Sequence, residues 1–499
     1  MASAVRGTSL KRILLGLLAA VVLLSLVLLA RAWSVESRQV DVIPADPLAI
    51  DAASAARTLA GLVGIPSISP QDPADFDGGA FARTHAYLAA RFPELHAELD
   101  RERVADWSLL YTWRGRDPSL RPILLAAHLD VVPAANDEDW THPPFAGVVR
   151  DGVVWGRGAI DDKGSIVALF AAATALLAEG FQPERTVYFA LGHDEEIGGD
   201  EGAAAIAARL SSRGVSLDWV LDEGGAVAGG FLPGLERDVA VVGIAEKGSV
   251  SIALDLEAPG GHSSVPPPHT AIGDLSSAVV ALEGNPVPAG FDGTTDAFLD
   301  HFTPELPFGF RVVLANRWLF DPVLERVFDG IPQLDAMQRT TTAVTIFDAG
   351  VKENILPPNG RVIVNFRIHP HDRVETVRDH VRRVVANERI RLQVGVRSPP
   401  RNPSAVSPVD GAAFTTLARC IRSVFPGAVV VPYLVLGGTD ARHYGGLTQN
   451  VYRFLPFRLD ADSMRLLHGT DERLAAADLV RGASFYAELL RRGAGAPGS

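Results

Sequence analysis

Two short apolar runs in this chain end directly in side chains that bind metal ions. Residues 123–127 lead into His-Leu-Asp at 128–130, and residues 186–191 lead into His-Asp-Glu-Glu at 193–196. An apolar run without alternation is typical of a buried parallel strand, and open α/β sheets place their sites at the carboxyl ends of such strands. The sequence therefore predicts an α/β fold whose central, mostly parallel sheet carries a metal site at one edge.

Three further segments add metal-binding side chains to this pattern. Gly-Arg-Gly-Ala-Ile-Asp-Asp-Lys-Gly occupies 156–164, Asp222 ends the apolar run 219–221, and His468 precedes Gly-Thr-Asp-Glu. Histidine and carboxylate ligands without cysteine are the set expected at a catalytic zinc site. We therefore expect the metal to take part in chemistry.

Length and charge restrict the other possibilities. A chain of 499 residues is too long for one hydrophobic core, so several domains are expected. The net charge is −13 and no long basic run occurs beyond the N-terminus. Because phosphate binding needs clustered lysine and arginine, nucleic acid is not an expected partner.

The N-terminus carries a targeting segment. Basic residues at 6, 11 and 12 precede Ile13–Ala30, an uncharged run of 18 residues. A membrane-spanning helix needs roughly 17–25 apolar residues, whereas the core of a signal peptide has about 7–15. The length favours an uncleaved signal anchor with a cytoplasmic N-terminus and the enzyme body outside. Ala30-Arg-Ala32 resembles a cleavage site, so secretion after cleavage is the alternative.

The periodicity of the chain changes near residue 248. Before it, strand-like and helical patterns alternate, as in an α/β domain. Ser249–Glu257 then alternates apolar and polar residues, as a half-buried strand does. Helices and alternating strands follow, which indicates an inserted α+β domain, and residues 285–340, rich in Phe and Pro, are expected to form an extra helical insertion.

These patterns predict the following organisation. The chain divides into a signal anchor or signal peptide at 1–32, a linker at 33–47, a catalytic domain at 48–247 and 405–492, an inserted lid domain at 248–404, and a disordered tail at 493–499.

The ordered motifs resemble the di-zinc aminoacylase and carboxypeptidase S family of metallopeptidases. They are His-Leu-Asp, Gly-Arg-Gly-(x)3-Asp-Lys-Gly, Glu-Glu, Leu-Asp-Glu-Gly-Gly, Gly-Gly-His-Ser-Ser and His-Gly-Thr-Asp-Glu. The resemblance covers roughly residues 50–490 and is strongest to the carboxypeptidase S branch, which contains N-acyl-amino-acid amidohydrolases. It implies a zinc-peptidase catalytic domain, an inserted lid or dimerisation domain, and two zinc ions per chain, with cobalt or manganese as alternatives.

The resemblance also implies the metal ligands. They are His128, Asp161, Glu196, Asp222 and His468. Asp161 corresponds to the carboxylate that bridges both metals, and it is preferred over Asp162 because it stands two residues before Lys163. Glu223 is the alternative to Asp222.

Catalytic roles follow from the same resemblance. Glu195 corresponds to the general base. Asp130 points to the same side as His128 in an extended chain and can fix the tautomer of that ring. His262 corresponds to a residue of the second domain that stabilises the oxyanion, often from a partner subunit. Asn354 and Arg367 correspond to substrate-contacting positions of the same domain. Arg442 can bind a substrate carboxylate through two hydrogen bonds, and the alternative is a buried ion pair between Arg442 and Asp440.

Together these expectations describe a zinc-dependent amidohydrolase or carboxypeptidase. A metal-bridging hydroxide attacks the amide of a peptide or N-acyl amino acid that has a free carboxylate. The partners expected are this small substrate, the membrane through the N-terminal helix, and a second copy through the lid. The insertion at 285–340 either lines a pocket for an acyl chain or packs against the lid. The non-enzymatic alternative is a membrane-anchored, metal-dependent binding protein without activity.

Overall fold

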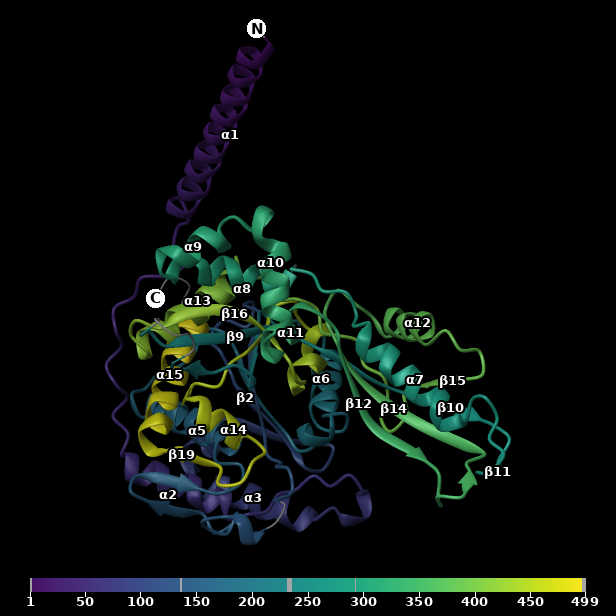
Figure 1. Ribbon diagram of the computed structural model, residues 1–499. Helices are drawn as coiled ribbons and strands as arrows, with labels where there is room; N and C mark the ends of the chain where they lie inside the picture. The colour runs from purple at the N-terminus through teal and green to yellow at the C-terminus, as the bar shows by residue number, and fades with distance from the viewer. Residues whose placement is uncertain (1, 135–136, 231–235, 292, 496–499) are drawn as a thin grey trace.

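The computed structural model describes residues 2–134, 137–230, 236–291 and 293–495. Figure 1 shows three parts: a body of sheet and helices, an arm that extends to one side, and the helix α1 (Ala2–Trp33), which points away from the body. Within α1, Lys11–Trp33 is a 23-residue apolar stretch that is long enough to cross a membrane, and its most apolar 18-residue window contains no buried residue. A signal sequence would have the same length and composition.

The body is built on a large mixed sheet. In space, the strands follow the order β1 (Asp100–Val104), β2 (Ser108–Trp113), β6 (Val187–Gly192), β3 (Ile123–His128), β7 (Val220–Asp222), β17 (Val451–Arg453), β9 (Val239–Glu246), β8 (Val227–Ala228) and β18 (Arg458–Leu459), with β16 (Val429–Val435) paired to β9. The predicted α/β class is confirmed.

The expectation of a mostly parallel sheet is wrong. Strands β6, β3, β7 and β17 are parallel. However, β2 is antiparallel to both β1 and β6, and β9 is antiparallel to both β17 and β8. The hairpin was missed because Asp100–Val104 is almost entirely polar, as an exposed edge strand can be.

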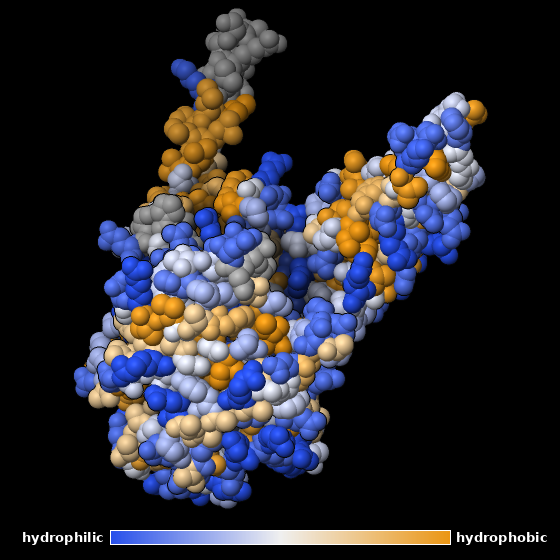
Figure 2. Space-filling model, turned by 90° about the horizontal axis from the view of Figure 1, so that it is seen from below, coloured by the Kyte–Doolittle hydropathy of each residue, from blue (hydrophilic) through white to orange (hydrophobic). Residues whose placement is uncertain are grey.

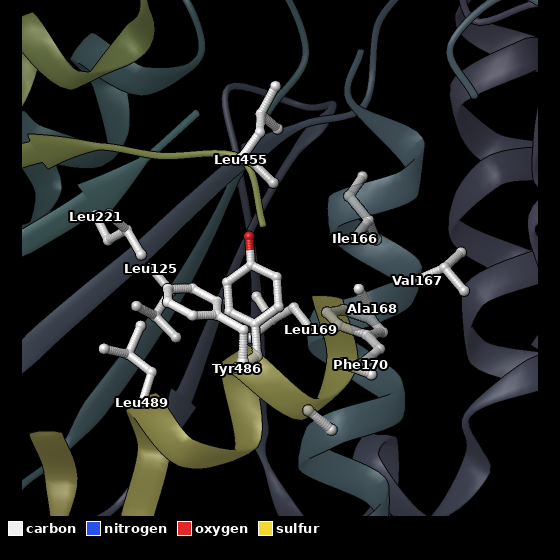
Figure 3. Packing of buried hydrophobic residues seen from close by; sticks show 14 of the residues in the cluster. Leu125, Ile166, Val167, Ala168, Leu169, Phe170, Leu221, Leu455, Tyr486 and Leu489 are labelled. Carbon is white, nitrogen blue, oxygen red and sulfur yellow. The ribbon is translucent and has the colours of Figure 1, made fainter. Parts of the chain in front are cut away.

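Both faces of the central strands are covered, which explains their unbroken apolar sequence. In β3, Leu125 packs towards one set of helices, α2 (Ala52–Val63), α5 (Lys163–Ala178), α13 (Ala412–Val424) and α15 (Ala476–Ala494). Leu124 packs towards α6 (Ala203–Ser212) on the opposite face. Figure 3 shows the first of these layers, where Tyr486 and Leu489 of α15 meet the apolar side chains of α5 and the sheet.

The arm contains a separate four-stranded antiparallel sheet. Its spatial order is β12 (Thr341–Ala349), β14 (Asn359–Ile368), β10 (Gly248–Glu257) and β15 (Arg391–Val394). The helices α7 (Ala271–Gly284) and α12 (Val374–Val385) pack on one face of it, through a core shared with alternate residues of β10 and β14. The small α+β unit that the alternating pattern predicted is therefore present.

The predicted helical insertion is also present. It comprises α8 (Gly293–Phe302), α9 (Phe308–Leu314), α10 (Arg317–Asp329) and α11 (Pro332–Gln338). It packs on the large sheet rather than on the lid, because Phe298, Phe302 and Phe328 share a core with Val239 and Val431. The alternative role, lining a pocket for an acyl chain, stays a prediction. The insertion thus belongs to the body and not to the arm, and α9 contacts the base of α1.

The two ends of the chain are more ordered than expected. In the predicted linker, the side-chain amide of Gln39 exchanges hydrogen bonds with the backbone of Val430 at 2.9 and 2.8 Å. At the other end, α15 continues to Ala494, whose carbonyl accepts a 2.7 Å hydrogen bond from the backbone N–H of Glu184. Residues 493 and 494 of the predicted tail therefore belong to α15, and residues 496–499 lie outside the described part of the chain.

Candidate functional site

Four segments bring their polar side chains together at the carboxyl end of the central strands. His128 ends β3, and Glu196 lies in the turn that follows β6. Asp161 precedes α5, and His468 lies in the loop before β19 (Arg473–Ala475). His128, Asp161 and Glu196 each offer one ligand atom, and these atoms lie within 4.8 Å of one another.

Asp161 stands between the two histidines. Its Oδ1 lies 2.9 Å from His128 Nε2, and its Oδ2 lies 3.0 Å from His468 Nε2. His468 Nε2 also lies 3.1 Å from Glu196 Oε2. Each oxygen of Asp161 therefore faces a different histidine, which is the geometry that a carboxylate shared by two cations requires.

The surrounding charge is strongly negative. Burial raises the pKa of the Glu195, Glu196 and Glu223 carboxyls, and neighbouring carboxylates raise it further. Asp162 and Asp222 each keep a buried oxygen without a hydrogen-bond partner in the described structure. Buried, unpaired acids are costly, so this donor set fits cations. Histidine nitrogens and carboxylate oxygens without thiols suit zinc and also cobalt or manganese.

Asp130 organises two of the ligand-bearing segments. It is fully buried, and its Oδ1 lies 3.3 Å from His128 Nδ1. The same carboxylate accepts hydrogen bonds from the backbone N–H groups of Glu195 and Glu196, at 3.2 and 3.1 Å. Asp130 therefore orients the His128 ring and positions the glutamate pair at once.

Glu472 organises the other two segments. Its buried carboxylate accepts hydrogen bonds from the backbone N–H groups of Gly158, Ile160 and Asp161, at 2.9, 2.8 and 3.1 Å. It also pairs with Arg157 at 2.6 Å. Arg157 in turn donates to the carbonyl of His468 at 3.0 Å. The loops of Asp161 and His468 are thus joined through one buried ion pair.

The backbone of these loops explains why such support is needed. His468 has φ of +57°, in the left-handed region that residues other than glycine rarely occupy. Gly158 has φ of +85°, and a side chain there would collide with Val131. The Arg157 and Glu472 bonds hold this otherwise unfavourable path in place.

Lys163 has a structural role in the same loop. Its Nζ donates to the backbone carbonyls of Leu62 and Ile65, at 3.2 and 2.6 Å. Burial lowers the pKa of its ammonium group to about 7. The lysine of the Asp-Lys-Gly motif therefore ties the start of α5 to the end of α2.

Asp222 and Glu223 occupy different environments. Asp222 is buried, and the charges that act most strongly on its pKa after burial are those of Arg453 and His128. Glu223 is half-buried, and Asp161 is the strongest charge acting on it. Both carboxyls therefore lie within the electrostatic reach of the His128 and Asp161 cluster, and either can serve as the fifth ligand.

The remaining predicted residues do not join this cluster within one chain. His262 lies on β11 (Gly261–His262), which Figure 1 shows at the outer end of the arm, far from α5 and β19. Asn354 is beside it, since the N–H of Ser263 donates to the Asn354 carbonyl at 3.2 Å. Arg367 is exposed on β14. Arg442 donates to the carbonyl of Gly198, in the segment just after the glutamate pair.

Residues that position the site were not predicted from the sequence. Glu472 closes the motif His-Gly-Thr-Asp-Glu, and Arg157 lies between two glycines, but neither had been given a role. Asp440, in Gly-Gly-Thr-Asp, is a further buried carboxylate near Glu195, and it helps raise the pKa of that glutamate. The sequence signal that could have identified these residues is a charged side chain within an apolar or glycine-rich motif.

Comparison with known proteins agrees with this geometry. The model of peptidase family M20/M25/M40 matches residues 124–492. The chain is 41% identical over 413 residues to a protein named probable carboxypeptidase S-like 2 of Dictyostelium discoideum, covering 82% of this chain and 79% of that one. It is 40% identical over 439 residues to an N-fatty-acyl-amino acid synthase/hydrolase, PM20D1, of Mus musculus, covering 87% and 86%.

A solved structure supports the fold. An M20 family metallo-carboxypeptidase of Sulfolobus solfataricus superimposes with a TM-score of 0.62 over 88% of this chain and 98% of its own, at 18% identity. At that identity the likeness concerns the fold alone, whereas the family match spans most of the chain. The chain therefore belongs to peptidase family M20/M25/M40, and it is a hydrolase that acts on amide bonds.

Proposed function

We propose that this protein hydrolyses the amide bond of an N-acyl amino acid or short peptide that ends in a free carboxylate. The observation that carries the proposal is Asp161, whose two oxygens face His128 and His468 separately. The names of the relatives, a carboxypeptidase S-like protein and an N-fatty-acyl-amino acid hydrolase, support this substrate class.

Family members are dinuclear metal enzymes, and the residues present fit two cations. We assign Asp161 as the bridging ligand, His128 to one metal, and Glu196 with His468 to the other. Asp222, or Glu223 next to it, would complete the set, because the charge of His128 acts on both carboxyls. Zinc ions bound here would polarise the amide carbonyl and lower the pKa of water.

Glu195 is the proton carrier in this proposal. Its pKa is raised by burial and by Glu223, Asp440 and Glu196, while His128 opposes the shift. A carboxylate with a raised pKa can accept a proton near neutral pH and pass it to the departing amine. Asp130 holds the Glu195 backbone and so fixes the position from which that transfer is made.

The arm supplies most of the remaining groups, and the body supplies Arg442, in η5 (Asp440–Gly446). Asn354 keeps a buried side-chain oxygen without a partner in the described structure. His262, on the adjacent strand, would stabilise the oxyanion after the arm closes or from a partner subunit. Arg367 and Arg442 are the candidates for binding the substrate carboxylate, since a guanidinium can bind it through two hydrogen bonds.

The helix α1 is proposed as a membrane anchor that keeps the body outside the cytoplasm. Lys11–Trp33 is long enough to span a bilayer. An inactive binding protein is not favoured, because Glu195 and the full set of candidate ligands are retained. Loss of the base with retention of the ligands would have marked such a protein.

Replacing Glu195 tests the mechanism. Glu195→Gln should lower kcat by about 10²–10⁴-fold, because the proton carrier is lost, while bound zinc remains unchanged. Initial rates would be measured on a dipeptide and on a long-chain N-acyl amino acid, and the faster substrate defines the class. Glu201→Gln, at an exposed position just downstream, is the matched control. Full activity of Glu195→Gln would refute the role.

Replacing Glu472 tests the link between the two ligand loops. Glu472→Gln leaves Arg157 buried without its counterion, which should cost about 3–5 kcal/mol of unfolding free energy. Zinc affinity should fall as well. The matched control is Glu257→Gln, since Glu257 pairs with Arg391 at the same 2.6 Å but is 75% exposed, and such pairs are worth about 0–1 kcal/mol. Equal effects in thermal melts would contradict the argument.

The raised pKa values of His128 and His468 predict that zinc binding depends on pH. Hydrogen bonds to Asp161 and Glu196 raise the pKa of His468 to about 10. Burial would lower the pKa of His128, but its bonds to Asp130 and Asp161 raise it well above its ordinary value. With a pKa of about 10, the His468 ring carries a proton at pH 7 without metal, and the pKa of His128 shifts in the same direction. Zinc must therefore compete with protons for these ligands.

Zinc affinity should accordingly rise with pH through the neutral range, and protons should be released on binding. A pH indicator in weakly buffered solution would record the release during titration with zinc. His468→Ala should reduce the number of protons released. Binding without any proton release would contradict the proposed ligand set.

A further inference from the structure

Helix α10 exposes a row of apolar side chains that its own packing does not require. Leu319, Val323 and Val327 recur every four residues and are 39%, 55% and 51% exposed. A spacing of four residues places them on one face of the helix. A different row, with Leu324 and Phe328, is buried against the body. Since Leu324 and Phe328 already pack α10 on the body, the exposure of the first row needs another explanation.

Neighbouring aromatic residues extend this apolar surface. Phe308 and Phe310 of α9 and Trp318 of α10 are 42%, 48% and 58% exposed. We refer to the six exposed residues as the α9–α10 face: Phe308, Phe310, Trp318, Leu319, Val323 and Val327. In Figure 1 both helices lie at the base of α1.

Two hydrogen bonds show which part of α1 lies beside the α9–α10 face. The side-chain amide of Asn316 donates to the carbonyl of Leu28 at 3.0 Å, and Arg31 Nε donates to the carbonyl of Ala315 at 3.2 Å. Leu28 lies five residues before the end of α1, which is about 7 Å along the axis. The start of α10 is therefore level with the last turns of the apolar helix.

The segment after α1 prevents the body from moving freely away from this position. Arg38 pairs with Asp300 at 3.1 Å, and the Ser37 hydroxyl donates to Glu305 at 2.5 Å. Both acidic residues belong to the helical insertion, and Gln39 is bonded to β16. The short path from α1 to the body is thus attached at three successive residues.

We propose that the α9–α10 face is a membrane-contact surface, which inserts its apolar side chains into the interfacial layer of the bilayer that α1 crosses. The proposal rests on the anchor role assigned to α1 above. Figure 2 shows the apolar surface along α1 that such a bilayer would cover. Tryptophan is enriched in this layer, and amphipathic helices with Trp, Phe and Leu on one face enter it by about 5–10 Å.

Fluorescent probes on the full chain in phosphatidylcholine vesicles test the proposal. Trp318→Cys and Val323→Cys, made one at a time, would each carry an environment-sensitive fluorophore. The single native cysteine, Cys420, is fully buried and should stay unlabelled. Quenching would be compared between nitroxide-labelled lipids and aqueous iodide. Val280→Cys, 69% exposed on α7 of the arm, is the matched control, and Leu23→Cys in α1 reports on the anchor itself.

The proposal expects lipid nitroxides to quench the probes at 318, 323 and 23, and iodide alone to quench the probe at 280. Quenching of 23 by lipid but of 318 and 323 only by iodide overturns the membrane-contact surface while the anchor stands. Absence of lipid quenching at 23 overturns both. Protection of 318 and 323 from both quenchers indicates a protein partner on this face, which also contradicts the proposal.

Discussion

The buried carboxylate of Glu472 is the interaction on which the site depends. It accepts hydrogen bonds from three backbone N–H groups of the Asp161 loop, and it neutralises Arg157. Arg157 then holds the His468 loop, which comes from a segment more than three hundred residues later in the chain. Without the Arg157–Glu472 ion pair, the loop of His468 would not be held beside the loop of Asp161.

A second constraint comes from the concentration of negative charge. Asp130 accepts the N–H groups of the glutamate pair, so the turn after β6 presents Glu195 and Glu196 towards Asp161 and Glu223. Such a cluster opposes folding unless protons or cations neutralise it. Function and stability are therefore coupled here, because the cations that catalysis needs would also relieve the repulsion that the fold imposes.

The sequence predicted two kinds of feature: segments with a regular apolar pattern, and polar side chains that directly follow such a segment. Continuous apolar strands such as Ile123–His128 were predicted because both of their faces are buried, and the side chains that end them identified the site. The polar edge strand Asp100–Val104 has no such pattern, so the mixed sheet was missed. Periodicity also could not show that the insertion packs on the large sheet, since that depends on contacts between distant segments.

The site residues also divide into those that the sequence predicted and those that it did not. Ligands adjoining strand ends were predictable, whereas Glu472 and Arg157 act through backbone groups that sequence does not reveal. Asp222 and Glu223 are adjacent in the sequence and both feel the charge of His128, so Asp222 stays a prediction with Glu223 as its alternative. His262 lies far out on the arm, so its proposed role depends on a movement or a partner that one chain in one conformation does not contain.

The measurement that tests the central claim most directly is anomalous diffraction at the zinc edge from crystals of the zinc-loaded protein. The account predicts two peaks that share Asp161, one beside His128 and the other beside Glu196 and His468. A single peak, or peaks that Asp161 does not touch, would contradict it.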